Sequence, residues 1–247
     1  MPTVSVIVAV FNRARTLPAC LDSIFTQTVR ALEIIVCDGG STDGSREIIV
    51  ANRARLTFWQ SQKDRGVAHA WNMALERATG EWISFLGADD RFAETVSLEK
   101  LLRAASDPAI NYICGQAALV GDEGRVQRVI GERWDWEQMK RYQHIAHPGS
   151  LHRRDLFARY GNFDERLAIA FDYDFLLRVG RDIYAEFVAE PVTLMGGAGQ
   201  SNTQAWRAFH ENRRIQRTHP EIGARAAVLN HAIAATKQLA RAALRRG

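Results

Sequence analysis

Residues Trp82–Asp90 read W-I-S-F-L-G-A-D-D, an apolar run that follows Gly80 and ends in two adjacent carboxylates. The run predicts a buried strand with Asp89 and Asp90 at its carboxyl end. Because α/β proteins bind ligands at the carboxyl ends of parallel strands, these hard oxygen ligands could hold a metal ion there. Taken alone, an Asp-Asp pair more often forms a turn and caps the next helix. The rest of the chain decides between the two interpretations.

The first hundred residues alternate between apolar strands and amphipathic helices. We expect strands at Val4–Phe11, Leu32–Cys37, Leu56–Gln60 and Trp82–Phe85. We expect helices at Leu17–Thr26, Arg46–Arg53, Val67–Ala78 and Ala93–Ala105. Nearly continuous β-branched strands are typical of a sheet that is covered on both faces. The alternation therefore predicts an α/β fold, a doubly wound three-layer α/β/α sandwich around a mainly parallel sheet.

The pattern changes after residue 107. A hairpin is predicted from Ile110–Val120 and Arg125–Ile130, which a Gly-Asp-Glu-Gly turn joins. The later elements are expected to be a helix at Tyr173–Gly180, short strands at Tyr184–Val188 and Val192–Met195, and helices at Gln204–Thr218 and Ile222–Arg246. No Pro- or Ser-rich linker separates the two parts, so residues 1–220 are predicted to form a single domain with two functional halves, 1–107 and 108–220.

Composition sets wide bounds. Of the 247 residues, 47% are hydrophobic and 24% are charged, and the formal net charge is +4, which is ordinary for a soluble globular protein. The mild positive charge is compatible with phosphate-bearing ligands, and we expect no nucleic-acid partner. Cys20, Cys37 and Cys114 lie far apart, so we expect reduced thiols in a cytoplasmic protein. We find neither a signal peptide nor an apolar run near the roughly 20 residues that span a bilayer.

Acidic residues recur where strands end or helices begin. Asp38 ends the second strand, Asp89 and Asp90 end the fourth, and Asp172 stands at the start of a helix. Helix N-termini, which favour anions, should face the same crevice, so the combination indicates a metal-bridged diphosphate. Mg²⁺ and Mn²⁺ commonly bind through one or two carboxylates together with substrate phosphates. The absence of a G-x-G-x-x-G or P-loop pattern disfavours a dinucleotide fold and a P-loop NTPase.

Four blocks of sequence carry a family resemblance. They are V-S-V-I-V-A-V-F-N from Val4, E-I-I-V-C-D-G-G-S-T-D-G-S from Glu33, the stretch D-R-G-V-A-H-A-W-N through G-A-D-D over 64–90, and Y-G-N-F-D-E…F-D-Y-D-F-L-L-R from Tyr160. In order and spacing they resemble an inverting family 2 glycosyltransferase of the GT-A fold. The resemblance implies a nucleotide-sugar-binding half at 1–107, an acceptor half at 108–220, and a Mn²⁺ or Mg²⁺ ion.

The resemblance also implies a set of residues around the nucleotide-sugar donor. They are Phe11, Asn12, Asp38, Arg65, Gly66, Asn72, Gly87, Ala88 and Asp89. Asp38 would bind the nucleotide base, although an Asp before two glycines can also be a plain turn-former. Arg65 would neutralise a phosphate or hold the base, unless it is a solvated surface charge. Asn72 would order the Arg65 loop, whereas Asp43 is expected to cap the following helix and not to touch the donor.

The metal motif departs from the family pattern. Where the family usually has Asp-x-Asp-Asp, this chain has Gly87-Ala88-Asp89-Asp90. Asp89 matches the metal-coordinating Asp, and Asp90 is either a second ligand or a helix cap. With one carboxylate fewer, we expect weaker metal affinity, and a metal-independent variant stays open. The missing side chain at Gly87 is expected to leave room for water or a donor group.

On the acceptor side, Asp172 matches the general base of the family, although Phe171 replaces the Glu that usually precedes it. Inverting transfer needs a carboxylate that takes the proton of the attacking hydroxyl. The alternative for Asp172 is an N-cap of its helix, and Asp174 is the second candidate for the base.

Other acceptor-side candidates are His147, beside the metal or the acceptor sugar, and Trp134, which either stacks on a sugar or packs in the core. His144, His147 and His152 also raise a zinc interpretation, but no Cys or Glu completes a recognised spacing.

The last segment, 221–247, reads as a basic amphipathic helix. Its apolar side is mostly Ala, and Lys237, Arg241 and Arg245 repeat every four residues on another side. Over 222–246 this pattern fits a weak anchor on the inner face of the cell membrane, and equally a helix that packs on its own domain or in a homodimer.

The family resemblance therefore implies transfer from a UDP- or dTDP-sugar to a glycan or lipid-linked glycan in cell-surface polysaccharide synthesis. The alternatives are a non-catalytic nucleotide-sugar-binding relative and a nucleotidyltransferase. The second of these lacks its Gly-rich phosphate loop after the first strand.

Overall fold

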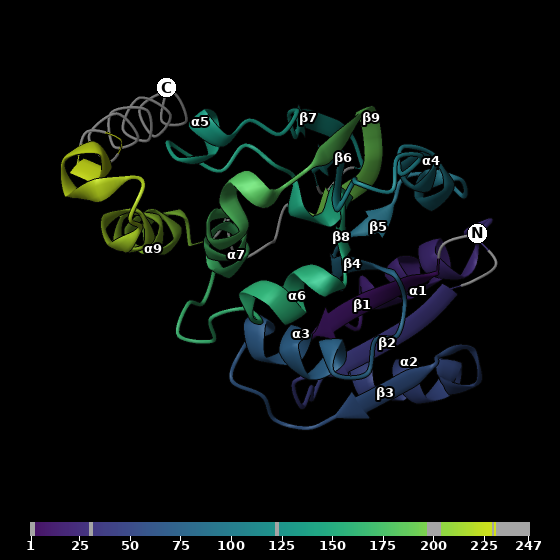
Figure 1. Ribbon diagram of the computed structural model, residues 1–247. Coiled ribbons are helices and arrows are strands. Elements are labelled where there is room, and N and C mark those ends of the chain that lie inside the picture. The colour runs from purple at the N-terminus through teal and green to yellow at the C-terminus, as the bar shows by residue number, and fades with distance from the viewer. Residues whose placement is uncertain (1–2, 30–31, 122–123, 197–203, 229, 231–247) are drawn as a thin grey trace.

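The computed structural model describes residues 3–29, 32–121, 124–196, 204–228 and 230. In this part of the chain, a mixed sheet lies between two layers of helices (Figure 1). The four strands of the first half are β1 (Val4–Val10), β2 (Leu32–Asp38), β3 (Phe58–Ser61) and β4 (Trp82–Gly87). They are parallel and adjacent, in the order β3-β2-β1-β4. The predicted α/β fold and its four parallel strands are confirmed.

Five further strands extend the same sheet beyond β4. They are β5 (Arg91–Phe92), which still lies in the first half, and β6 (Tyr112–Val120), β7 (Val126–Ile130), β8 (Ser150–Arg153) and β9 (Ala185–Gly196) of the second half. The order continues β4-β8-β6-β9-β5, and β7 pairs with β6 off this path. Strand β8 is antiparallel to both of its neighbours, whereas β9 runs parallel to β6. The hairpin prediction holds, and the short strand β5 was not predicted.

The expectation of two separate strands, Tyr184–Val188 and Val192–Met195, is wrong. Strand β9 runs through both segments, and its register against β6 shifts on either side of Gln116. Pro191 lies at this irregularity, opposite Gln116. Because proline has no N–H for the ladder, a bulge allows the strand to continue where a regular ladder would end.

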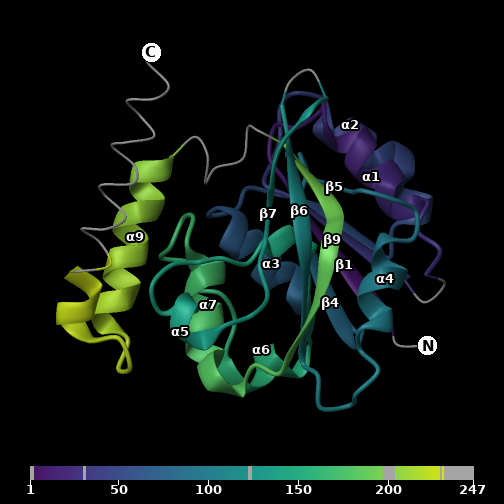
Figure 2. The same ribbon diagram turned by 90° about the horizontal axis from the view of Figure 1, so that it is seen from above.

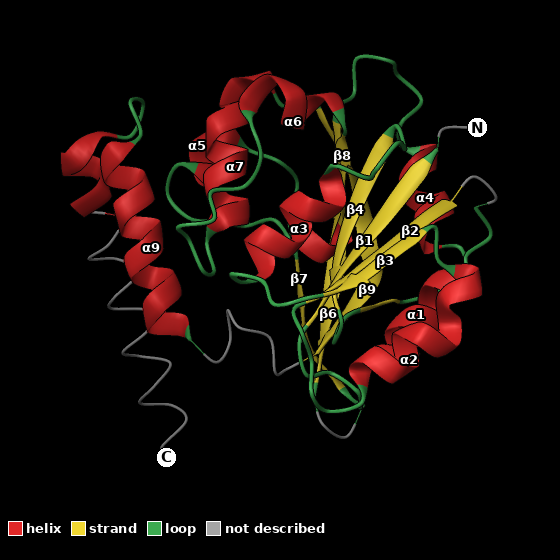
Figure 3. Cartoon of the chain, turned by 90° about the horizontal axis from the view of Figure 1, so that it is seen from below, coloured by secondary structure: helices red, strands yellow, loops and turns green. Residues whose placement is uncertain are grey.

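Helices cover both faces of the sheet (Figures 2 and 3). One face carries α1 (Leu17–Phe25), α2 (Ser45–Asn52) and α4 (Ser97–Arg103), and the other carries α3 (Val67–Leu75), α6 (Asp155–Tyr160) and α7 (Phe171–Val179). The short helix α5 (Trp136–Met139) lies near α7, and α9 (Ala205–Thr218) lies outside α7. Helix α4 begins later than predicted because residues 93–96, which follow β5, form bends and turns.

The alternating side chains of β1 divide between two hydrophobic cores. Val6 and Val8 belong to the core beneath α1 and α4, whereas Ile7 belongs to the core beneath α3, α6 and α7. All three are fully buried. Burial on both faces explains why the strand reads as a continuous apolar run.

The predictions about the last helix, membrane spans and the cysteines can be compared with the described residues. Residues beyond 230 lie outside the described residues, and with them most of the helix expected over Ile222–Arg246. Within the described part, residues 223–228 are helical. None of the described helices is both long and apolar enough to cross a membrane. The three cysteines are buried free thiols, as expected.

Glu33 ties the entry of β4 to β1 and β2. Its carboxylate accepts hydrogen bonds from the hydroxyl of Ser5 at 2.5 Å, the N–H of Thr79 at 2.9 Å and the N–H of Gly80 at 3.2 Å, and also from the Thr79 hydroxyl. Partial burial alone would raise the pKa of Glu33, but these hydrogen bonds outweigh it and hold the pKa below its ordinary 4.5. The ionised carboxylate therefore fixes the turn from which β4 starts.

We predict that Glu33→Gln lowers the free energy of unfolding by about 1–2 kcal/mol at neutral pH, because an amide keeps only one acceptor oxygen. The pKa is lower in the folded state, so this stabilisation is present above the unfolded pKa and is lost as pH falls through the folded value. The difference in unfolding free energy between wild type and variant should thus be constant at pH values above 4.5, the ordinary pKa of Glu33, and should shrink at lower pH. Urea unfolding at several pH values measures this, and a difference that grows on acidification would contradict it.

Candidate active site

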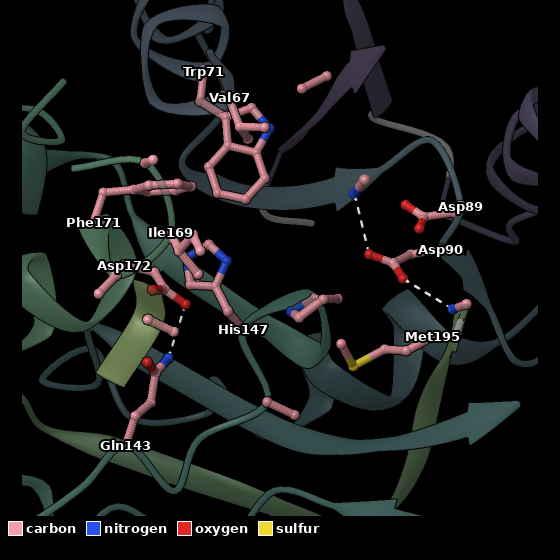
Figure 4. A pocket seen from close by; sticks show the side chains of 18 of the residues that line it. Val67, Trp71, Asp89, Asp90, Gln143, His147, Ile169, Phe171, Asp172 and Met195 are labelled. Carbon is pink, nitrogen blue, oxygen red and sulfur yellow. Dashed lines mark hydrogen bonds between the residues drawn. The ribbon is translucent and has the colours of Figure 1, made fainter. Parts of the chain in front are cut away.

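A cavity of about 440 Å³ opens at the carboxyl ends of β1 and β4. One wall is formed by the end of β4, with Asp89 and Asp90, and by Phe11 after β1. The opposite wall is formed by His147 and by the start of α7 with Asp172 (Figure 4). Strand β9 and helix α9 add further lining residues. The predicted metal acids and the predicted base therefore face one cavity from different elements.

Asp90 is fixed by the backbone at the end of β4. Its carboxylate accepts hydrogen bonds from the N–H of Gly87 at 3.2 Å and from the N–H of Gly196 on β9 at 3.3 Å (Figure 4). Its own N–H donates to the Gly87 carbonyl and closes a turn over 87–90. Helix α4 begins at Ser97 with Val96 as its N-cap, so the interpretation of Asp90 as a helix cap is wrong.

The space at Gly87 is used in a way that the sequence did not indicate. A Cβ atom at this position would lie 2.9 Å from Asp89 Oδ1 and 3.1 Å from Asp90 Oδ2. The missing side chain at Gly87 thus makes room for the carboxylates of Asp89 and Asp90. The sequence had instead suggested that water or a donor group would use this space. An Asp at position 87 would force both carboxylates to shift.

The two acids repel each other in a buried place. Burial, and then the charge of Asp89, raise the pKa of Asp90 from 3.8 to about 7. Asp89 Oδ2 is buried and has no hydrogen-bond partner among the described residues. A buried oxygen without a partner and a pair of like charges are both relieved by a cation, so these residues fit a divalent metal ion. No group of three or more His, Cys, Asp or Glu side chains in the described chain could hold a metal alone.

Asp172 occupies the first turn of α7 and is held from two sides. Its Oδ2 accepts a hydrogen bond from Gln143 Nε2 at 2.8 Å (Figure 4), and its Oδ1 accepts one from its neighbour's N–H, that of Tyr173, at 2.8 Å. The N-cap of α7 is Ala170, so the interpretation of Asp172 as the N-cap is wrong. Each carboxylate oxygen keeps a lone pair for a further hydrogen bond.

The loop before Asp172 is anchored by a carboxylate from α9. Glu211 accepts hydrogen bonds from three consecutive backbone N–H groups, those of Ala168 at 3.1 Å and of Ile169 and Ala170 at 2.9 Å each. Free N–H groups at a helix start favour a negative charge, and here a distant helix supplies it. The position of Asp172 therefore depends on α9 as well as on α7.

Aromatic rings form the floor between the two walls. The ring of His147 stacks on Trp71, with centroids 5.2 Å apart, and on Phe85 of β4, at 5.5 Å. Burial lowers the pKa of His147, although the charge of Asp172 opposes this, so the ring is neutral near pH 7. His147 Nε2 is buried without a partner among the described residues. Trp71 and His147 both line the cavity.

Several predicted donor residues hold the loops beside the cavity. Buried Asp38 accepts hydrogen bonds from the backbone and hydroxyl of Ser41 and from Ser61 Oγ at 2.6 Å. Asn12, at φ +50°, accepts a hydrogen bond from the N–H of Thr42. Asp43 accepts hydrogen bonds from Ser45 N at 3.1 Å and from Ala14 N at 2.9 Å, but the N-cap of α2 is Gly44, so the expectation that Asp43 caps this helix is wrong. Asp38 is not among the residues that line the cavity, and its contact with a base stays a prediction.

Arg65, Glu165 and Asn72 form one chain of contacts. Arg65 is exposed and pairs with Glu165, which also accepts a hydrogen bond from Asn72 Nδ2 at 3.1 Å. The Asn72 amide further bonds the backbone of Phe163 in both directions. Gly66, at φ +119°, is the N-cap of α3, and a Cβ atom there would meet no described atom within 4 Å. Asn72 thus orders the Arg65 loop through Glu165.

Two predicted acceptor-side residues lie away from the cavity lining. Asp174 forms an ion pair with Arg178 at 2.8 Å, and Arg178 also donates to the carbonyl of Asn162 at 2.7 Å. Trp134 is half-buried and packs edge-on against Tyr112, with centroids 6.2 Å apart. Neither residue is among those that line the cavity.

The zinc interpretation of the three histidines is wrong for the described chain, where they form no group that could hold a metal. His144 Nε2 lies 3.1 Å from the Arg133 carbonyl, away from the other two rings. His147 and His152 do lie close, with centroids 5.0 Å apart, but both rings are buried among aromatic side chains.

Comparison with known sequences identifies the family. The family model described as glycosyl transferase family 2 matches residues 5–163, which is more than half of the chain. The chain belongs to glycosyltransferase family 2. It is an enzyme of that family, and the predicted family and enzyme class are confirmed.

Relatives and solved structures agree with this assignment. A PGL/p-HBAD biosynthesis glycosyltransferase of Mycobacterium bovis BCG is 32% identical over 192 residues, which cover 72% of this chain and 69% of the relative. S. aureus TarS residues 1–349 with UDP-GlcNAc superpose with a TM-score of 0.69 at 17% identity, covering 88% of this chain and 67% of that one. The chain spans 40% of the length of the longer TarS structure.

A second fold match is the mannosyltransferase PcManGT of Pyrobaculum calidifontis in complex with GDP-Man and Mn²⁺. Its TM-score is 0.62 at 22% identity, and the match covers 97% of this chain and 75% of that one. At these identities the two structures support the GT-A fold, which the sequence predicted.

The candidate site contains residues that sequence reasoning missed. They are Arg13, Trp71, Gln143, Gly196, Glu211 and Asn212. Trp71 lies inside one of the blocks that carried the resemblance, so its position could have pointed to it. Gln143 and Glu211 carry no local signal, because their roles arise from contacts with residues 29 and 41–43 positions away.

We predict that Asp89→Asn stabilises the ligand-free glycosyltransferase. The pKa of Asp90 is raised from 3.8 to about 7, so this pair costs stability increasingly as pH rises through that window. Removing the charge of Asp89 should raise the free energy of unfolding by about 1–2 kcal/mol at mildly alkaline pH and by less at acidic pH. Urea unfolding at both pH values measures this. A variant that is less stable than wild type at alkaline pH would contradict the repulsion.

Proposed function

We propose that this glycosyltransferase transfers a sugar, with inversion, from a nucleotide-diphospho-sugar to a hydroxyl of a glycan or lipid-linked glycan. The observation that carries the proposal is the pair of acidic groups on different walls of one cavity. Asp89 and Asp90 end β4, and Asp172 begins α7 (Figure 4). A diphosphate on the first wall leaves the anomeric carbon directed toward the second, where the attacking hydroxyl must stand.

The donor wall suits a diphosphate. Asp89 and Asp90 would hold a Mn²⁺ or Mg²⁺ ion, which when bound would neutralise the charge of the departing nucleoside diphosphate. Arg13 also lines the cavity and brings a guanidinium, a good partner for phosphate oxygens. Phe11 is 58% exposed beside it and offers a ring face for the nucleotide. The fold match to a mannosyltransferase with GDP-Man and Mn²⁺ supports a metal-dependent donor site.

The acceptor wall suits base catalysis. Asp172 takes the proton of the acceptor hydroxyl while that oxygen forms the new bond to the anomeric carbon. The bond from this carbon to the diphosphate oxygen breaks, and its electron pair leaves with the nucleoside diphosphate. Gln143 and the N–H of Tyr173 fix the orientation of the carboxylate. Because attack and departure occur on opposite faces of the carbon, the configuration inverts.

The donor is proposed to be UDP- or dTDP-linked, and the product to be part of a cell-surface glycan. The fold match to TarS with UDP-GlcNAc supports the first point, and the mycobacterial relative, named for PGL/p-HBAD biosynthesis, supports a glycolipid or glycan product. Peripheral association with the inner face of the membrane stays a prediction, because most of the segment 222–246 that would mediate it lies outside the described part of the chain.

A thermal-shift screen tests the donor class. The panel is UDP-glucose, UDP-galactose, UDP-GlcNAc, dTDP-rhamnose and GDP-mannose, each with and without Mn²⁺. A donor at about 100 times its Kd should stabilise the folded protein by roughly 2.7 kcal/mol. We expect a uridine or thymidine donor to raise Tm only with Mn²⁺, and Asp89→Ala to abolish the Mn²⁺-dependent part. A shift that is equal without metal would instead favour the metal-independent alternative.

Asp172→Asn tests the base. We expect the variant to bind the donor with wild-type affinity but to lose about 100-fold or more in transfer rate, because the amide cannot accept the proton. Asp174→Asn is the matched comparison on the same helix, since its carboxylate pairs with Arg178. An equal or larger loss in Asp174→Asn, or near-normal turnover in Asp172→Asn, would move the base away from Asp172.

A further inference from the structure

Helix α9 builds part of the acceptor wall, although it lies outside the residues matched by the family model. That match ends at residue 163, whereas Ala208 and Asn212 of α9 both line the cavity. They lie four residues apart, and therefore on one face of the helix. No sequence motif pointed to either residue.

The same face of α9 is fastened to the loop that carries the base. Glu211, next to Asn212, accepts the hydrogen bonds from Ala168, Ile169 and Ala170, and its side chain is only 13% exposed. Arg207, one turn earlier, pairs with Glu211 at 3.3 Å. Asn212, which follows Glu211, is thus held in a defined place relative to the loop that carries Asp172.

Asn212 Oδ1 is buried and has no hydrogen-bond partner among the described residues. Buried polar side chains nearly always have a partner, so an exception at a cavity calls for a partner from outside the described chain, either a water molecule or a group of a ligand. The orphan atom is an acceptor, so it needs a donor such as a hydroxyl. An ionised phosphate oxygen has no proton to give.

Resting on the proposed function, we propose that Asn212 binds a hydroxyl of the acceptor sugar and so helps to select a glycoside as acceptor. The bound hydroxyl is a different one from the hydroxyl that reacts, because Asp172 takes the proton of the reacting group. The amide also offers N–H donors, so it can accept from one hydroxyl and donate to a second oxygen of the same sugar. Glu211 holds Asn212 at a fixed position relative to the loop that carries Asp172.

The test measures transfer to p-nitrophenyl glycosides of glucose, galactose, rhamnose and N-acetylglucosamine, with the donor found by thermal shift. We expect Asn212→Ala to lower kcat/KM for the preferred glycoside about tenfold, the effect of losing one uncharged hydrogen bond in a buried site. Donor affinity by calorimetry and donor hydrolysis by water should stay at wild-type values. Arg214→Ala, on the exposed side of the same helix, is the matched control and should leave all three unchanged.

Deoxy versions of the preferred glycoside locate the contact. Removing the hydroxyl that faces Asn212 should cost wild type about tenfold and Asn212→Ala almost nothing, whereas other deoxy positions should affect both proteins equally. Equal losses at every position, an unchanged kcat/KM in Asn212→Ala, or hydrolysis of the donor with no transfer to any glycoside would each overturn the proposal. A protein that neither binds nor hydrolyses any donor would instead refute the proposed function.

Discussion

The repulsion between Asp89 and Asp90 is the constraint on which the site depends. Burial, and then the charge of Asp89, raise the pKa of Asp90 to about 7, and the backbone N–H groups of Gly87 and Gly196 offset only part of this cost. This unfavourable arrangement persists because the many contacts of the surrounding sheet hold the end of β4 in place. Under the proposed function, a cation bound together with the diphosphate would relieve the repulsion, so the folded chain would hold in advance the charge that the donor complex requires.

The sheet brings this arrangement to a defined place. Strands β1 and β4 are parallel neighbours, so Phe11 and the two acids leave the sheet at the same edge. Glu33 fixes the other end of β4 through the Thr79–Gly80 turn. Strand β9 arrives from the second half of the chain and supplies the N–H of Gly196 to Asp90. The donor wall is therefore a product of both halves, even though its acids come from the first.

The sequence predicted the first half well because its information is local. Apolar runs ended in polar residues, acids or glycines, and each became a parallel strand whose carboxyl end faces the cavity or the loops beside it. It failed where the outcome depended on distant contacts. The continuation of β9 through Pro191 needs the irregular register of β6. The use of the space at Gly87 by the neighbouring carboxylates follows from their rotamers, which no pattern of residues reveals.

The acceptor wall shows the same limit most clearly. Asp172 could be proposed from its motif, but the groups that hold it could not, since Gln143 comes from an irregular segment and Glu211 from a helix beyond the family match. This difference has a physical basis. Under the proposed function, the diphosphate is common to many donors and needs the same strand ends, whereas acceptors differ and can be met by changing a helix outside the family match. In that proposal Asn212, beside the anchoring Glu211, stands where a change would alter recognition while the base stays in place.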